Sequence, residues 1–219
     1  DSRIWPRAAA IAERFWSPKE INDVKNMLHR LNEVSYRLEE LGISHIKNKD
    51  VILRNMTNNQ DIESLMTLSN ICEPLKMYSR NKGGTEYKSF SPFTLFADAC
   101  TADAADELKF KNAVQLFLAV PDSEHKKLVL SFFDNWISGY ENFEELKASP
   151  ILNNLRPNYT NLWQISKLYQ KALLTNSVNK EQLQEINDVL NQLKLPFADV
   201  EFVITDELVK ISEFLESSN

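Results

Sequence analysis

The feature that most limits how this chain can fold is an alanine-rich segment near its start, between two prolines. The segment reads Trp-Pro-Arg-Ala-Ala-Ala-Ile-Ala-Glu-Arg-Phe-Trp-Ser-Pro over residues 5–18. Pro6 suits the first position of a helix, because its φ is already helical and no N–H is needed there. Alanine is the strongest helix former, so we predict a helix that is apolar on almost every side. Such helices are normally buried inside a larger body.

This segment resembles part of glycoside hydrolase family 20, the β-N-acetylhexosaminidases. In that family a Trp-Pro-Arg, an alanine-rich turn, Ala-Glu-Arg, an aromatic pair and a serine lead into the last helix of the catalytic (β/α)8 barrel. The resemblance covers residues 4–42, and residues 43–219 resemble more loosely the helical tail of some bacterial members. It implies that residues 1–42 are the terminal helical segment of a truncated barrel. Residues 43–219 would form an α-helical C-terminal accessory domain.

The resemblance also implies that the reacting groups lie outside this chain. Family members use an adjacent Asp-Glu pair far upstream, in substrate-assisted hydrolysis, and grip the sugar with a Trp-x-Glu about twenty residues before Ala-Glu-Arg. Both positions fall before Asp1. We therefore expect a fragment without turnover of its own, with no catalytic, cofactor-binding or metal-binding residue and no cofactor. By resemblance, Arg7, Glu13 and Arg14 should hold the closing turn of the barrel through ion pairs or capping.

Partners and location follow from the same resemblance. The expected partners are the rest of the parent barrel, a second copy in a homodimer, and, through the parent, glycans that carry N-acetylhexosamine. The parent would remove that terminal sugar, and would be periplasmic, cell-surface or secreted, and soluble. The accessory domain would brace the barrel or mediate dimerisation.

Composition is consistent with a soluble helical protein. The 219 residues are 43% hydrophobic and 26% charged, as in ordinary globular domains. Only 4 glycines are present, which favours helices joined by short polar turns. The net charge of −6 is spread without a block of one sign, which argues against binding to nucleic acid. No apolar run reaches the ~18 residues that a membrane span requires.

Apolar stripes at three- and four-residue spacing predict an all-α fold, an irregular multi-helix bundle. The first long helix should be capped by Ser17, with Pro18 at its first position, and should end at Gly42. Residues 43–57 should be a connection with extended character at Val51–Leu53. Further helices are predicted over 62–72, 93–99, 104–120, 123–146, 162–173, 180–193 and 206–215.

Several patterns could be functional sites, and each also has a structural interpretation. The carbohydrate-binding alternative uses four aromatic side chains as sugar platforms: Trp136, Trp163, Tyr140 and Tyr159. The structural interpretation is that aromatic stripes at helical spacing are more often part of a core. The other functional alternative is a helical protein-interaction module. The carboxylates Asp98, Asp103, Asp106 and Glu107 lack the spacing of an EF-hand loop and suit the first turns of helices.

The remaining polar motifs are weaker. The loop at Gly83-Gly84 lacks the full phosphate-binding P-loop pattern. None of His29, His45 and His125 has a second histidine at metal-ligand spacing. Cys72 and Cys100 are expected to be small buried residues, with pairing left open.

Overall fold

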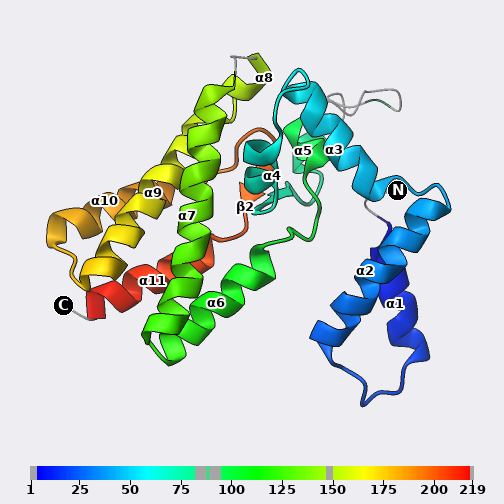
Figure 1. Ribbon diagram of the computed structural model, residues 1–219, viewed down its shortest axis with the longest axis horizontal. Helices are drawn as coiled ribbons and strands as arrows, with labels where there is room; N and C mark the ends of the chain where they lie inside the picture. Colours follow the sequence, from blue (N-terminus) through cyan, green and yellow to red (C-terminus); the bar gives the residue numbers. More distant parts are fainter. Residues whose placement is uncertain (1–3, 82–87, 89–94, 147–149, 218–219) are drawn as a thin grey trace. The chain divides into compact units, whose positions relative to one another are not determined.

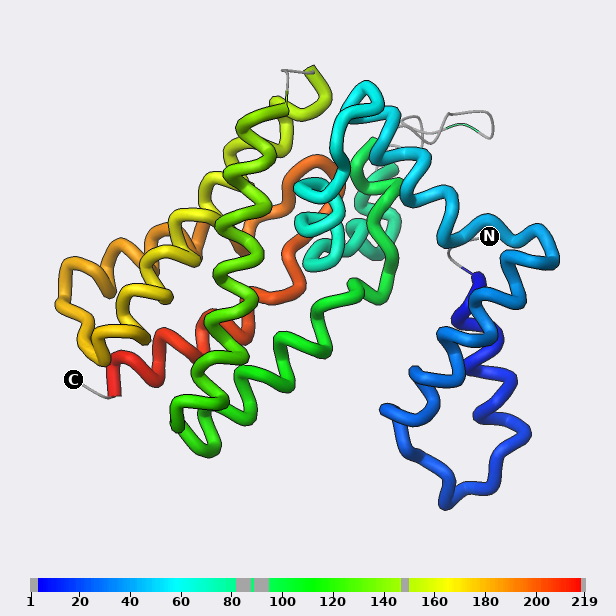
Figure 2. The backbone as a smooth tube through the Cα atoms, in the orientation of Figure 1, coloured from blue at the N-terminus to red at the C-terminus, as the bar shows by residue number. Residues whose placement is uncertain are grey.

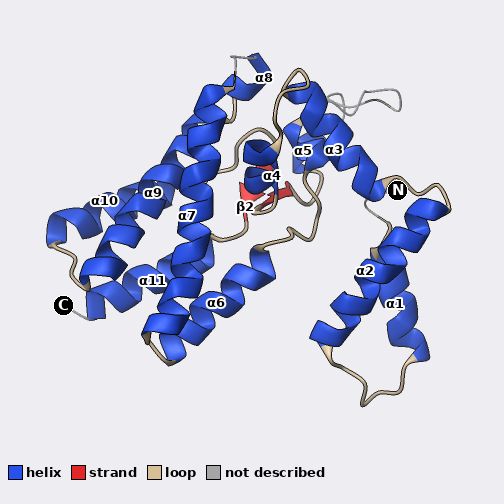
Figure 3. Ribbon diagram, in the orientation of Figure 1, coloured by secondary structure: helices blue, strands red, loops and turns tan. Residues whose placement is uncertain are grey.

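The computed structural model describes residues 4–81, 88, 95–146 and 150–217. Within these residues the chain has eleven α-helices, one short 3-10 helix, η1 (Ser79–Asn81), and a two-stranded sheet (Figure 3). The predicted all-α fold class is confirmed. The chain divides into two compact units, which we call the N-terminal unit (Asp1–Val51) and the C-terminal unit (Ile52–Asn219).

The N-terminal unit is built on a helical hairpin. Its helices α1 (Arg7–Trp16) and α2 (Val24–Glu40) pack against each other, and residues 17–23 connect them (Figures 1 and 2). Pro6 stands one position before α1 rather than at its first residue. Gly42 has a φ of +90° just after α2, the left-handed conformation that glycine adopts without steric cost.

The predicted start of the second helix is wrong by six residues. Asp23, not Ser17, caps α2, and its carboxylate accepts the backbone N–H of Asn26 at 3.0 Å. The physical reason lies in Arg14. Its guanidinium donates to the carbonyl oxygens of Lys19 at 3.3 Å and of Ile21 at 2.7 Å. These carbonyl groups are held in a loop and are not available for a helix that starts at Pro18.

The connection predicted over residues 43–57 is also wrong, because helix α3 (His45–Met56) occupies most of it. The segment predicted to be extended, Val51–Leu53, is a run of three apolar residues. A short apolar run does not distinguish a strand from one buried side of a helix. Here it is a helix, and the side chain of Leu53 is fully buried.

The C-terminal unit is a bundle around one long helix. Its helices are α4 (Glu63–Ser69), α5 (Phe96–Ala99), α6 (Glu107–Ala119), α7 (Ser123–Glu145), α8 (Pro150–Asn153), α9 (Arg156–Thr175), α10 (Lys180–Leu193) and α11 (Thr205–Ser217). Helix α7 packs on α4, α6 and α9, while α10 lies against α9 and α11 (Figure 1). Asp122 caps α7 and Asn179 caps α10, so these two helices begin at the residues where the sequence predicts their starts. Part of the helix predicted over 93–99 lies outside the described residues.

A short antiparallel sheet joins two distant parts of the C-terminal unit. Strand β1 (Cys72–Pro74) pairs with β2 (Val200–Phe202), so that Glu73 stands directly opposite Glu201. Like charges in this position repel each other. The ammonium of Lys76 lies between them, 3.1 Å from the Glu73 carboxylate and 3.4 Å from that of Glu201. The hydrogen bond to Glu73 is the main cause of a raised Lys76 pKa.

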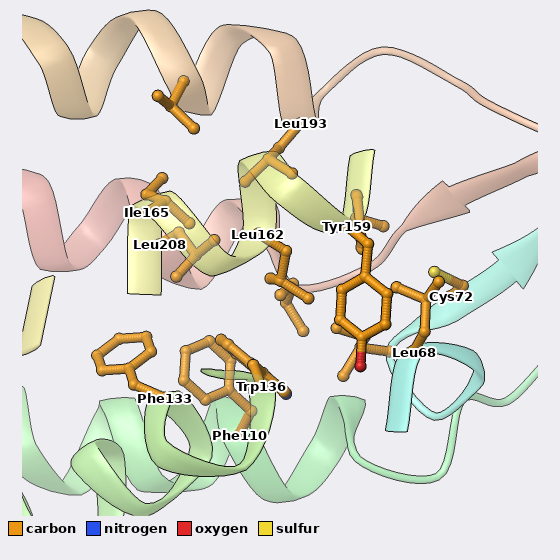
Figure 4. Packing of buried hydrophobic residues seen from close by; sticks show 14 of the residues in the cluster. Leu68, Cys72, Phe110, Phe133, Trp136, Tyr159, Leu162, Ile165, Leu193 and Leu208 are labelled. Carbon is orange, nitrogen blue, oxygen red and sulfur yellow. The ribbon is translucent and has the colours of Figure 1, made fainter. Parts of the chain in front are cut away.

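The core of the C-terminal unit is rich in aromatic side chains (Figure 4). The indole of Trp136 is fully buried and meets the rings of Phe110 and Phe133 edge to face, with centroids 4.9 and 5.6 Å apart. Tyr159 is also fully buried, and its hydroxyl donates to the carbonyl of Ser64 at 2.9 Å. Burial raises the pKa of this hydroxyl. The apolar stripes predicted for this unit therefore face one another.

Two further properties can be read from the described residues. Cys72 and Cys100 are both buried, and neither is in a disulfide. In the part of the chain that the structure describes, no helix is both long and apolar enough to cross a bilayer.

Candidate interaction surface

The N-terminal unit is a folded hairpin that hardly buries anything. Over its described residues, 4–51, only the side chain of His45 is buried. Among the described residues of α1 and α2 none reaches that state. A helix pair of this length in water derives most of its stability from covering an apolar face. The hairpin therefore presents surface that another body could cover.

The exposed side chains are large and apolar. We define the hairpin apolar surface as six of them: Ile11, Phe15, Trp16, Ile21, Val24 and Leu28. Phe15 is 84% exposed and Trp16 is 89% exposed, which is unusual for side chains of this size. Ile11 and Phe15 are four residues apart, as are Val24 and Leu28, so each pair lies on one side of its helix. Large apolar side chains that are exposed together on one hairpin are candidates for an interaction surface.

Two charged contacts hold the hairpin in shape. The Glu13 carboxylate on α1 accepts two hydrogen bonds from the Arg30 guanidinium on α2, at 2.6 and 3.3 Å. This contact is the main cause of a raised Arg30 pKa. Arg14 fixes the connection by its bonds to backbone carbonyl groups. Glu13 thus forms an ion pair and Arg14 binds backbone carbonyl groups within the hairpin. Arg7 is exposed on the first turn of α1. That these three residues hold the closing turn of a barrel stays a prediction from the family resemblance.

The structure places the four predicted sugar platforms inside or near the core. Trp136 and Tyr159 are fully buried, so the prediction of exposed stacking surfaces is wrong for both. Tyr140 and Trp163 are half-buried, with ring centroids 5.5 Å apart. Lys167 lies over the Trp163 ring at 4.3 Å. The physical reason is helix periodicity: aromatic residues at three- and four-residue steps face the neighbouring helices.

Three of the four carboxylates considered as metal ligands lie at helix starts, and two of these form ion pairs. Asp98 lies in the first turn of α5 and pairs with Arg80 at 2.9 Å. Asp106 precedes α6 and pairs with Lys109 at 2.8 Å, and Glu107 lies in the first turn. Burial raises the pKa of Glu107. Among the described residues no group of three or more His, Cys, Asp or Glu side chains could hold a metal ion. Gly83 and Gly84 lie outside the described residues.

The histidines are separate from one another. His29 is exposed beside Glu33, 3.9 Å away. The Nε2 atom of His45 lies 2.5 Å from the Ser35 hydroxyl, which fastens the start of α3 to α2. His125 lies 3.0 Å from the carbonyl of Val120. Sequence reasoning missed the contacts of Ser35 and Arg30, since nothing in their neighbourhood in the sequence marks a partner ten or more residues away.

Comparison with known proteins finds similarity over nearly the whole chain. No family model matches. A solved chitobiase from Flavobacterium johnsoniae, FjGH20, is 47% identical, with a TM-score of 0.89 over 96% of this chain. Two curated β-hexosaminidases are similar over shorter segments. Subunit A2 from Dictyostelium discoideum is 46% identical over 44 residues, which is 20% of this chain, and subunit beta from Felis catus is 48% identical over 42 residues, or 19%.

The similarity extends over only a part of each of these proteins. This chain spans 32% of the chitobiase and 8% of each of the two curated relatives. Most of the length of each relative therefore has no counterpart in the 219-residue sequence.

Proposed function

This chain is related to the family 20 β-hexosaminidases, and we propose that it forms the C-terminal, non-catalytic part of such a protein. The α1–α2 hairpin would cover the wall of the catalytic barrel, and the C-terminal unit would be the accessory domain that braces it. The whole protein would remove terminal N-acetylhexosamine from glycans, outside the cytoplasm. Residues 1–42 and 43–219 would then be the last barrel segment and the accessory domain.

One observation carries this proposal: the hairpin apolar surface has large exposed side chains and the hairpin has almost no buried ones. Covering side chains such as Ile11 and Phe15 contributes about 1.5–3 kcal/mol each. That contribution is absent while the hairpin faces water. This chain spans only 32% of the chitobiase. In a protein of similar length, the remaining part would be large enough to cover the hairpin.

The catalytic half of the proposal is tested by assaying two proteins with a chromogenic N-acetylglucosaminide. The 219-residue chain should show no turnover, whereas the longer protein that contains it should hydrolyse the substrate. Steady hydrolysis by the pure chain would refute the non-catalytic assignment.

The docking half is tested in the longer protein with Phe15→Asp and Ile11→Asp. Each should lower the free energy of unfolding, since a carboxylate is then buried against the barrel. Leu174→Asp is the matched control, because Leu174 is 63% exposed against 56% for Ile11 and belongs to the C-terminal unit. Equal effects of all three variants would contradict docking through the hairpin. Loss of a dimer, rather than of stability, would assign the surface to self-association.

A further inference from the structure

We propose that a pocket in the hairpin receives one large, uncharged side chain from the part of the longer protein outside this chain. The inference rests on the proposed function and specifies how the hairpin is recognised. The pocket has a volume of about 270 Å³. It lies where α1, α2 and residues 17–23 meet, and its lining includes Ala10, Ile21, Val24 and Met27. Ligand pockets for whole small molecules usually exceed this volume, so the size suits a single side chain.

The charged residues around the pocket already have partners within the hairpin. Glu13 and Arg30 pair with each other, and Arg14 donates to backbone carbonyl groups. Asp23 accepts the Asn26 N–H as the cap of α2. The two acidic and two basic groups sum to zero, so the pocket offers a charged partner no net charge of opposite sign. A charged occupant would lose its hydration without gaining a counter-ion, which is costly.

The pocket is continuous with the hairpin apolar surface. Ile21 and Val24 belong to both. At protein interfaces, aromatic or large aliphatic anchors fill pockets near the centre of the contact and carry much of the binding energy. Ala10 contributes only a methyl group to the lining, which leaves room for such an anchor. The occupant is therefore an indole, phenyl or branched aliphatic group of the covering barrel.

The test uses indole as the probe on the complete 219-residue chain, with the NMR signal of the Met27 methyl group as the readout. Indole should shift this signal saturably at millimolar concentration. Indole-3-acetate and tryptamine carry a negative and a positive charge on the same ring system, and each should bind at least about 5-fold more weakly. The absence of a saturable shift, or equal binding of the charged probes, would overturn the proposal.

Two variants locate the site. Ala10→Trp fills the pocket and should abolish the indole shift, whereas Ala12→Trp should leave it, since Ala12 is exposed on the same helix and is not part of the lining. The comparison of neutral and charged probes needs no variant, so it decides the matter even if Ala10→Trp misfolds. Indole binding that is equally strong in both variants would place the probe elsewhere and contradict the proposal.

The same indole titration on the longer protein separates this inference from the proposed function. In the longer protein the pocket should already be filled, and indole should no longer shift the Met27 signal. If the hairpin amides become protected there while indole still binds, the proposed docking stands and the occupied pocket is refuted. If indole binds equally in both proteins and the amides remain unprotected, the proposed function fails as well.

Discussion

The N-terminal and C-terminal units contain similar helices but differ in what their apolar side chains contact. In the C-terminal unit Trp136 is fully buried between aromatic rings. In the N-terminal unit Trp16 is 89% exposed. Both residues lie on amphipathic or apolar helices, so the difference is not one of local sequence. It shows that the C-terminal unit contains its own core, whereas the described residues of the N-terminal unit leave almost all of their apolar side chains unburied.

The largest expected effect compares the same substitution in the two units. Trp136→Ala should lower the free energy of unfolding of the chain by about 3–5 kcal/mol, because a large cavity remains in a packed core. Trp16→Ala should change it by less than about 0.5 kcal/mol, as for most exposed sites. Urea denaturation measures both. A cost above about 2 kcal/mol for Trp16→Ala would show that the hairpin is covered within this chain.

A glycine in α7 tests how tightly the C-terminal unit is packed. A Cβ at Gly139 would collide with the Tyr159 hydroxyl and lie 3.0 Å from the Thr67 methyl group. Gly139→Ala should therefore destabilise the chain by about 1–3 kcal/mol, although alanine ordinarily favours a helix. Ser138→Ala, at the adjacent exposed position, should be neutral or stabilising. Stabilisation by Gly139→Ala would indicate that α7 and α9 are loosely packed.

The cap of α10 should have a smaller effect. Asn179 accepts the Gln182 backbone N–H at 2.8 Å, and the Gln182 side chain accepts the Asn179 N–H at 3.0 Å. Asn179→Ala should cost about 1 kcal/mol, measured by thermal unfolding. Asn191→Ala, exposed within the same helix, is the control and should cost nothing. Equal effects would mean that the cap does not stabilise α10.

The smallest effect is a dependence on pH through Glu107. Burial first, and then the nearby Glu73 carboxylate, raise the pKa of Glu107 in the folded chain. The folded state therefore favours the protonated form, and the free energy of unfolding falls as pH rises from the unfolded pKa through the folded one. Glu107→Gln should stabilise the chain at about pH 7.5 more than at about pH 4. A difference of the opposite sign would contradict the burial of this carboxylate.

Much of the C-terminal unit could be predicted from the sequence because its signals are local. Asp122 and Asn179 mark the starts of α7 and α10, and the stripes between them set which sides face inward. What failed depended on distant contacts or on ambiguous patterns. Val51–Leu53 could be strand or helix until tertiary packing decided. Ser17-Pro18 looked like a helix start, but Arg14 binds the carbonyl groups that follow.

The hairpin surface could be predicted only through the family resemblance. Composition identified an apolar helix near the start of the chain, and general experience says that such a helix is buried. The structure shows Phe15 and Trp16 exposed within this chain. The pairing of Glu13 with Arg30, 17 residues apart, could not be read from spacing, because it depends on how the two helices turn toward each other.

The most direct test of the central claim is hydrogen exchange of the backbone amides in α1 and α2. We expect fast exchange in the 219-residue chain, where the hairpin lacks a core, and at least about 100-fold slower exchange in the longer protein, where the barrel covers it. The amides of α7 should exchange slowly in both proteins. Equal exchange of the hairpin amides in the two proteins would contradict the account.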